Sequence, residues 1–166
     1  MTIALFAAPL LFCGCNTTMR SGPTSIDSAR AEAQAAQMVN DARAAAGLSP
    51  LALDPRLSRA ARAQSETMRS KASFAADATE GVGHWGNLRK RVEQMGYSPR
   101  VVRENVAGGE GVGIAELHQM LLDSPKHRVN LLCTDCAEMG VGVVYSNRRL
   151  YLTQVFGAQR DARSRP

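Results

Sequence analysis

Three polar residues that are far apart in the sequence have the chemistry of a binding site: His84, Glu104 and His127. His84 lies in the glycine-rich stretch "EGVGHWG", the kind of loop in which binding residues concentrate. Glu104 alternates with Val102 and Val106, so these three residues would share one face of a strand. A carboxylate on an apolar face is costly unless a partner stabilises its charge. Glu104 therefore predicts a histidine, an arginine or a metal beside it.

His127 belongs to the stretch "DSPKHRVNLL". Ser124 and Pro125 predict the first turn of a helix there, which would hold His127 in a fixed place. Two histidines and a carboxylate could together ligate zinc. Their spacing is not that of a local metal motif such as HExxH. The residues alone leave the alternative that each histidine, His118 included, is a hydrogen-bonded structural residue.

Hydrolysis is a second chemistry that these residues could support. His84 or His127 would act as the general base, and Ser124 or a metal-bound water would be the nucleophile. No serine lies in a G-x-S-x-G elbow, so such an arrangement could form only through the fold.

Cys133 and Cys136 form the motif "CTDC". A thioredoxin-like redox motif needs a strand before it and a helix after it, whereas here a helical pattern precedes and a strand pattern follows. In an exported chain the spacing favours a structural disulfide. A metal-binding pair and two free thiols are the alternatives.

The first 15 residues, "MTIALFAAPLLFCGC", are apolar but too few to span a bilayer. They predict a signal peptide, and "LLFCGC" predicts a bacterial lipoprotein site with Cys15 as the lipidated residue. The alternative is a buried first helix. Residues 16–25 are polar and rich in turn residues, which predicts a tether between the membrane and the domain.

The composition is that of a single globular domain of 166 residues with a net charge of +5. Aromatic residues make up only 5% of the chain, and no basic run forms a stripe, which argues against a nucleic-acid partner. A basic surface that faces anionic lipid or a cell-wall polymer is consistent with the charge.

The elements that must position these residues can be predicted from periodicity and capping. Helices are expected at 26–46, at 56–71 after the capping pair Asp54–Pro55, at 87–95 and at 114–124. A strand is expected at 101–106, closed by Gly108 and Gly109, and a β-hairpin at 138–157 with "SNRR" as its turn. This order predicts an α+β domain with a small antiparallel sheet flanked by helices.

Several of these motifs, in this order, resemble the bacterial branch of the CAP superfamily of cysteine-rich secretory, antigen 5 and pathogenesis-related 1 proteins. They are "RENVAGG", "DSPKHRVNLL", "EMGVGVVY" and "YLTQVFG", preceded by "MVNDARAAAGLSPLALDPRLSRAARAQSETM". The resemblance covers residues 29–157. It implies an α-β-α sandwich with a three-stranded antiparallel sheet, and a secreted or envelope location, either lipoprotein-anchored in the periplasm or extracellular.

The resemblance also implies a central cleft lined by two histidines and two acidic residues. Glu104 matches the glutamate of the family's "GEN" motif, with Arg103 in place of glycine. His127 matches the histidine of "SPxHRxNIL", and His84 matches the histidine that precedes the third helix. Glu138 is the candidate for the fourth position. The first three would form the metal set, with zinc as the candidate ion.

The family has no agreed enzymatic activity, and lipid binding is associated with some members. The sequence thus predicts an exported, lipid-anchored binding module in residues 26–157, with a disordered tail at 158–166. Its cleft would hold a divalent metal, a lipid-like ligand or a cell-wall ligand. The alternatives are a hydrolase and a structural domain with a vestigial cleft.

Overall fold

The computed structural model describes residues 25–71 and 83–160 of the chain. The helices are α1 (Ser25–Ala45), α2 (Pro55–Ser70), α3 (Gly83–Gln94), α4 (Ile114–Asp123) and α5 (Pro125–Leu131). The strands are β1 (Ala52–Leu53), β2 (Pro99–Glu110), β3 (Glu138–Ser146) and β4 (Arg149–Gln159). Among these described helices, none has the length and apolar content that crossing a bilayer would require.

The strands form one sheet in the order β1-β3-β4-β2. β3 and β4 are an antiparallel hairpin, and Ser146 pairs with Arg149 across its two-residue turn. Asn147 occupies this turn with a φ of 56°, a conformation that asparagine tolerates better than most residues. β2 pairs antiparallel with β4, while the two-residue β1 pairs parallel with β3. β2 is therefore the last strand of the sheet, and within the described part of the chain its outer edge is not paired with another strand.

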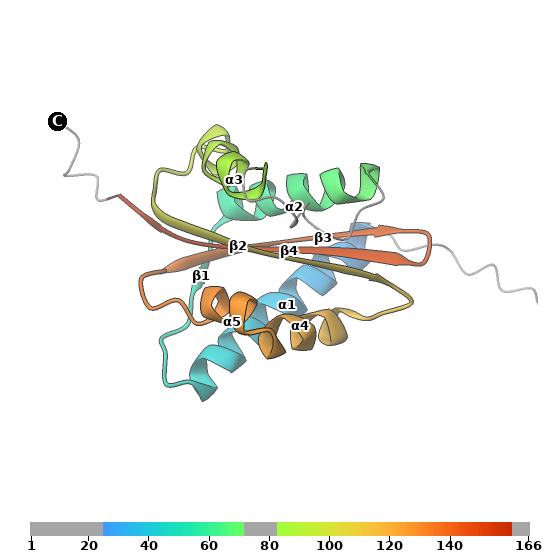
Figure 1. Cartoon of the computed structure of the whole chain (residues 1–166), viewed down its shortest axis with the longest axis horizontal. Coiled ribbons are helices and arrows are strands. Elements are labelled where there is room, and N and C mark those ends of the chain that lie inside the picture. The colour runs from blue at the N-terminus through green and yellow to red at the C-terminus, as the bar shows by residue number, and fades with distance from the viewer. Residues whose placement is uncertain (1–24, 72–82, 161–166) are drawn as a thin grey trace, which may run out of the picture.

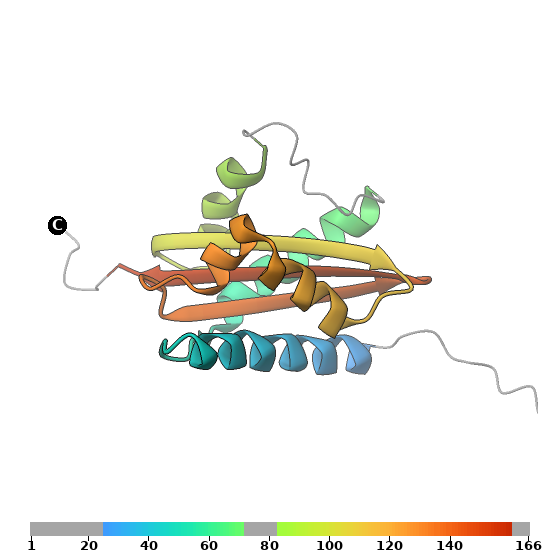
Figure 2. The same ribbon diagram turned by 60° about the horizontal axis from the view of Figure 1, so that its bottom comes forward.

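The sheet is the middle layer of a three-layer sandwich. Figure 1 shows α2 and α3 on one face of the sheet and α1, α4 and α5 on the other. Figure 2 shows α1 running along β3, with α4 and α5 in front of the sheet near β2. Each face has its own core, because the side chains of successive strand residues point to opposite faces. The predicted α+β class and sandwich are confirmed, with one more short strand than predicted.

Glycines of β3 allow α2 to approach the sheet closely. A Cβ atom on Gly140 would lie 2.2 Å from the Leu57 carbonyl carbon, and one on Gly142 would lie 2.2 Å from the Arg62 nitrogen. The backbone of α2 therefore rests directly on β3. The predicted cap of α2 is also present, since the Asp54 carboxylate accepts hydrogen bonds from the first turn.

Three boundaries differ from the sequence-based expectation. α3 begins at Gly83 and not at residue 87, so His84, which was expected in a loop, lies in the first turn of this helix. β2 continues through Gly108 and Gly109 to Glu110, because its whole length pairs with β4. β4 in turn runs to Gln159, so Ala158 and Gln159, which were predicted to begin a tail, pair with β2. Strand pairing thus overrides the local preference of glycine for turns.

The predictions for residues 1–24 lie outside the described residues. They include the signal peptide, the lipidation of Cys15 and most of the tether. Most of the predicted tail, residues 161–166, also lies outside them.

Candidate functional site

Glu104 is the buried acidic residue at the centre of the candidate site. Its side chain is fully buried and forms an ion pair with Arg91 of α3. Arg91 also donates to the Gln64 side chain at 3.0 Å, so it joins β2 to α2 as well. Burial raises the pKa of Glu104 to about 7, and the Arg91 guanidinium opposes this shift. The predicted need for a charge partner is confirmed, and the described partner is an arginine.

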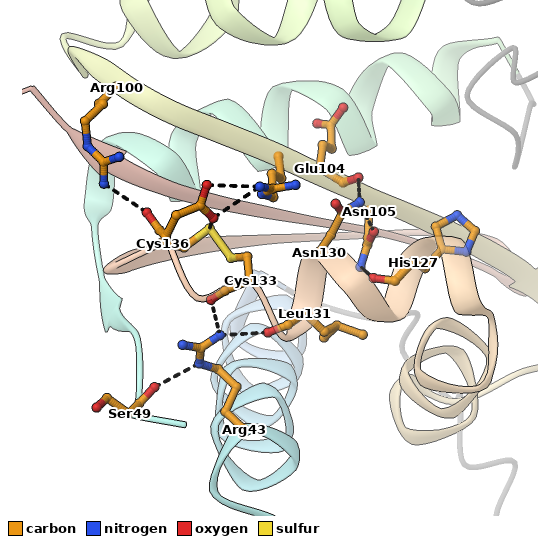
Figure 3. The surroundings of a disulfide bond; sticks show 12 residues. Arg43, Ser49, Arg100, Glu104, Asn105, His127, Asn130, Leu131, Cys133 and Cys136 are labelled. Carbon is orange, nitrogen blue, oxygen red and sulfur yellow. Dashed lines mark hydrogen bonds and ion pairs between the residues drawn. A yellow bond between two sulfur atoms is a disulfide. The ribbon is translucent and has the colours of Figure 1, made fainter. Parts of the chain in front are cut away.

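Two asparagines attach α5 to the outer edge of β2. Asn130 donates through Nδ2 to the backbone carbonyl of Glu104 at 3.1 Å and to Asn105 Oδ1 at 2.9 Å. Asn105 in turn donates to the backbone carbonyl of His127 at 3.0 Å. Both asparagines are buried, so these bonds satisfy groups that would be costly to leave unpaired. Figure 3 shows this link between Glu104, Asn105, Asn130 and His127.

His127 is held on α5 by a local contact. Its Nδ1 lies 2.9 Å from Ser124 Oγ, the residue that immediately precedes the helix. Burial lowers the pKa of His127, and the charge of Lys126 lowers it further, so the ring is neutral at neutral pH. The expectation that a helical turn fixes this imidazole is confirmed.

Glu104 and His127 lie on either side of β2. Asn105 faces α5, and successive strand residues point to opposite faces, so the Glu104 side chain faces α3 on the other side of the sheet. Figure 3 shows the Glu104 carboxylate pointing away from Asn105 and Asn130. A cleft that includes both Glu104 and His127 must therefore run around the outer edge of β2. Whether they share such a cleft stays a prediction.

Glu138, the candidate for the fourth cleft position, lies at the start of β3. It accepts hydrogen bonds from the Tyr97 hydroxyl at 2.5 Å and from Gln159 Nε2 at 2.8 Å. Tyr97 is buried against Gly157, where a Cβ atom would lie 2.7 Å from the hydroxyl. Burial and the neighbouring Glu138 carboxylate raise the pKa of Tyr97. These contacts give Glu138 a role in closing the end of the sheet.

The described contacts of Glu104 and His127 fit a divalent metal poorly. Arg91 already supplies a positive charge at the Glu104 carboxylate, and a cation bound there would be repelled by it. Ser124 contacts one ring nitrogen of His127, leaving Nε2 as the available ligand atom. His84 lies in the first turn of α3, and its side chain is outside the described residues, so the predicted zinc set of His84, Glu104 and His127 stays a prediction.

The predicted disulfide between Cys133 and Cys136 is present. It follows α5 and precedes β3, so the helix and strand are in the reverse of the order that a thioredoxin-like motif requires. The buried Arg43 of α1 donates to the carbonyls of Leu131 and Cys133 at 3.0 and 2.9 Å. This segment is thus fixed both by a covalent bond and by α1 (Figure 3).

The contacts of three residues at this site were not predicted from the sequence. They are Arg91 in "GNLRKR", Asn105 in "REN" and Asn130 in "HRVN". An asparagine one residue after Glu104 and another three residues after His127 were the available signal. Two buried amides on separate elements can satisfy one another, which a single motif does not reveal.

The comparisons with known proteins agree on the fold. The sequence profile of the CAP group, described as the cysteine-rich secretory protein family, matches residues 36–156. The chain is similar to the uncharacterized protein YkwD of Bacillus subtilis, with 31% identity over 131 residues, 79% of this chain and 48% of that protein. The chain thus spans about half the length of this curated relative.

Two solved structures extend the comparison. An extracellular protein of Bacillus anthracis that contains a SCP domain is 27% identical, with a TM-score of 0.67 over 84% of this chain and 45% of that one. An outer surface protein of Borrelia burgdorferi is 17% identical, with a TM-score of 0.68 over 79% of this chain and 94% of that one. The second likeness is one of fold.

Proposed function

The chain belongs to the cysteine-rich secretory protein (CAP) family, and from this we propose that it is an exported, non-enzymatic binding module. Its ligand-binding region is the outer edge of β2, between α3 and α5. Similar proteins are described as extracellular or as outer surface proteins, which supports export. The apolar residues 1–15 and the "LLFCGC" stretch support anchoring through a lipidated Cys15.

The observation that carries the proposal is the pair of buried links at the edge of β2. Glu104 is held from one side by Arg91 and from the other, through its carbonyl, by Asn130. A buried ion pair is a weak source of stability, because desolvation offsets much of its attraction. Two charges kept in a buried layer therefore support a role in binding.

The proposal can be tested by native mass spectrometry of the purified protein, with elemental analysis of the same sample. We expect a co-purified small molecule or ion in the wild type and its loss in Glu104→Gln. His127→Ala should reduce it as well, while Arg148→Ala, an exposed position in the turn after β3, should not. Equal occupancy in all four proteins would instead support a structural domain with a vestigial cleft.

Two binding assays distinguish a lipid-like ligand from a metal ion. A dansyl-labelled fatty acid should show saturable fluorescence with the wild type and a weaker signal with His127→Ala if the ligand is lipid-like. Zinc measured by a chelator competition assay should bind with one equivalent if the predicted metal set forms. The Arg91 contact leads us to expect the first result.

Membrane anchoring needs its own test, because it depends on a different part of the chain. Metabolic labelling with an alkyne fatty acid should modify the wild type and leave Cys15→Ala unlabelled. A labelled Cys15→Ala protein, or an unlabelled wild type in the membrane fraction, would contradict the anchor.

A hydrolase is the second candidate, and one contact favours it. The neutral imidazole of His127 lies 2.9 Å from the hydroxyl of Ser124 and could accept its proton. These residues are three apart at the start of one helix, a spacing that also arises locally without catalysis. A fluorophosphonate probe that labels the wild type but not Ser124→Ala or His127→Ala would establish this candidate.

A further inference from the structure

A hollow lies beside the disulfide, on the outward face of α5. It has a volume of about 640 Å³, and the residues that line it do not include Glu104 or His127. From α5 and the residue after it come Pro125, Arg128, Val129 and Leu132, at positions that repeat as one helical face. The opposite wall comes from Arg103 of β2 and from the disulfide loop, Cys133–Asp135.

The walls of this hollow are fixed in place before any ligand arrives. The disulfide closes the loop, and Arg43 holds the carbonyl of Cys133 from beneath. Arg103 donates to both carboxylate oxygens of Asp135 at 3.1 and 3.0 Å, and Arg100 donates to the Asp135 carbonyl. A preorganised site loses less entropy on binding than a flexible one.

The charge in the hollow is positive and not fully compensated. Asp135, the only acidic residue among the described ones that line it, is paired with Arg103. Arg128 is exposed, and its guanidinium has no partner within residues 25–71 and 83–160.

Apolar surface lies next to this charge. Val129 is 60% exposed, one of the few large hydrophobic residues on the described surface. Val129 and Leu132 are three positions apart and lie on the same side of α5. We propose that this hollow binds a short peptide segment of a partner protein that carries a carboxylate beside an aliphatic side chain.

The dimensions and chemistry favour such a peptide over other anions. The α5 face from Pro125 to Leu132 is about 10 Å long, the length of about three extended residues. A membrane surface is attracted by clusters of roughly four to eight basic residues, and only Arg103 and Arg128 line this hollow. Nucleic acid stacks on aromatic residues, and the lining contains none.

The test is a selection of random heptapeptides displayed on phage against the immobilised, oxidised full-length protein. We expect enriched sequences in which Asp or Glu adjoins Leu, Ile or Val. The winning peptide should bind Arg128→Ala about tenfold more weakly, the loss of about one charge contact. Arg148→Ala, another exposed arginine, should bind it as the wild type does.

Two further measurements complete the test. Replacing the Asp of the winning peptide by Asn should weaken its binding to the wild type as much as Arg128→Ala does. When both changes are combined, the losses of binding free energy should not be additive. Val129→Ser should also weaken binding, while thermal unfolding confirms that each variant is folded.

Several outcomes would overturn the proposal. They are no enrichment above the uncoated surface, enriched peptides without an acid, or binding that Arg128→Ala leaves unchanged. Preferential binding to phosphatidylglycerol vesicles that depends on Arg128 would assign the hollow to a membrane instead. Variants at Glu104 should not affect any of these assays, so the result is independent of the function proposed for the β2 edge.

Discussion

The two faces of the sheet are packed by different means. On the α2 face, backbone meets backbone, because Gly140 and Gly142 have no side chains to separate β3 from the helix. Ser65 of α2 adds a hydrogen bond to the Gly142 carbonyl at 2.9 Å. On the other face, α5 is held at a distance by polar side chains, chiefly Asn105 and Asn130.

This difference separates stability from function. Direct backbone contact leaves no room for a ligand and tolerates no added atom. Polar side chains hold an element in place and still leave hollows between their attachment points, as beside the disulfide. We therefore expect substitutions where α2 rests on β3 to affect folding, and those at the edge of β2, Glu104 included, to affect both stability and binding.

The largest effect is expected for Gly142→Val. Its side chain would overlap backbone atoms of α2 that cannot move aside, at 2.2 Å from the Arg62 nitrogen. We expect a loss of about 4 kcal/mol or more in the free energy of unfolding, or no folded protein. Urea unfolding followed by circular dichroism measures this. Gly113→Ala is the control, since a Cβ atom there meets nothing within 4 Å.

Asn130→Ala should have the next largest effect, on the other face. It leaves the Glu104 carbonyl and the Asn105 side chain without a buried donor, at a cost of about 3 kcal/mol. Hydrogen exchange should show faster opening along the edge of β2. Gln119→Ala removes only an exposed contact and should change stability by less than about 0.5 kcal/mol. Equal losses of stability in Asn130→Ala and Gln119→Ala would show that the buried asparagine bonds do not hold α5 on β2.

Much of the α2 face could have been predicted from the sequence. In "EMGVGVVY" the valines alternate with glycines, so one face of β3 is apolar and the other has no side chains at Gly140 and Gly142. The alternation of Val141, Val143 and Tyr145 predicts a strand, and the strand is present. The glycines carried the further information that a helix must lie directly against that face.

The α5 face could be predicted only in part. The start of α5, the disulfide and the need of Glu104 for a partner all follow from local patterns. The choice of Arg91 as that partner depends on how α3 packs on β2, and no spacing in the sequence encodes it. The two-residue β1 was missed for a similar reason, because only its pairing with Glu138 and Met139 defines it.

A smaller effect is expected from Cys133→Ser with Cys136→Ser. The disulfide closes a very short loop, so its removal should cost about 2 kcal/mol through the entropy of the unfolded chain. Arg43 still holds the Leu131 carbonyl in the variant, which limits the local change. Urea unfolding of the variant and of the wild type, each with and without a dithiol reductant, measures this. The reductant should lower the stability of the wild type only.

The smallest effect is a pH dependence that comes from His118 of α4. This histidine is buried, its Nδ1 has no hydrogen-bond partner among the described residues, and burial lowers its pKa although Asp41 of α1 opposes the shift. The unfolded chain therefore takes up a proton at a pH where the folded protein does not, so stability falls as the pH drops below about 6.5.

The slope of this fall is at most about 1.4 kcal/mol per pH unit for one group. The free energy of unfolding of His118→Gln, measured between pH 7 and pH 5, should fall less steeply than that of the wild type. Arg148→Ala, which changes an exposed residue without a histidine, should follow the wild-type curve. Parallel curves for the wild type and His118→Gln would show that the α1–α4 contact does not keep this imidazole neutral, and the acid sensitivity would then come from another group such as His127, whose pKa is also lowered.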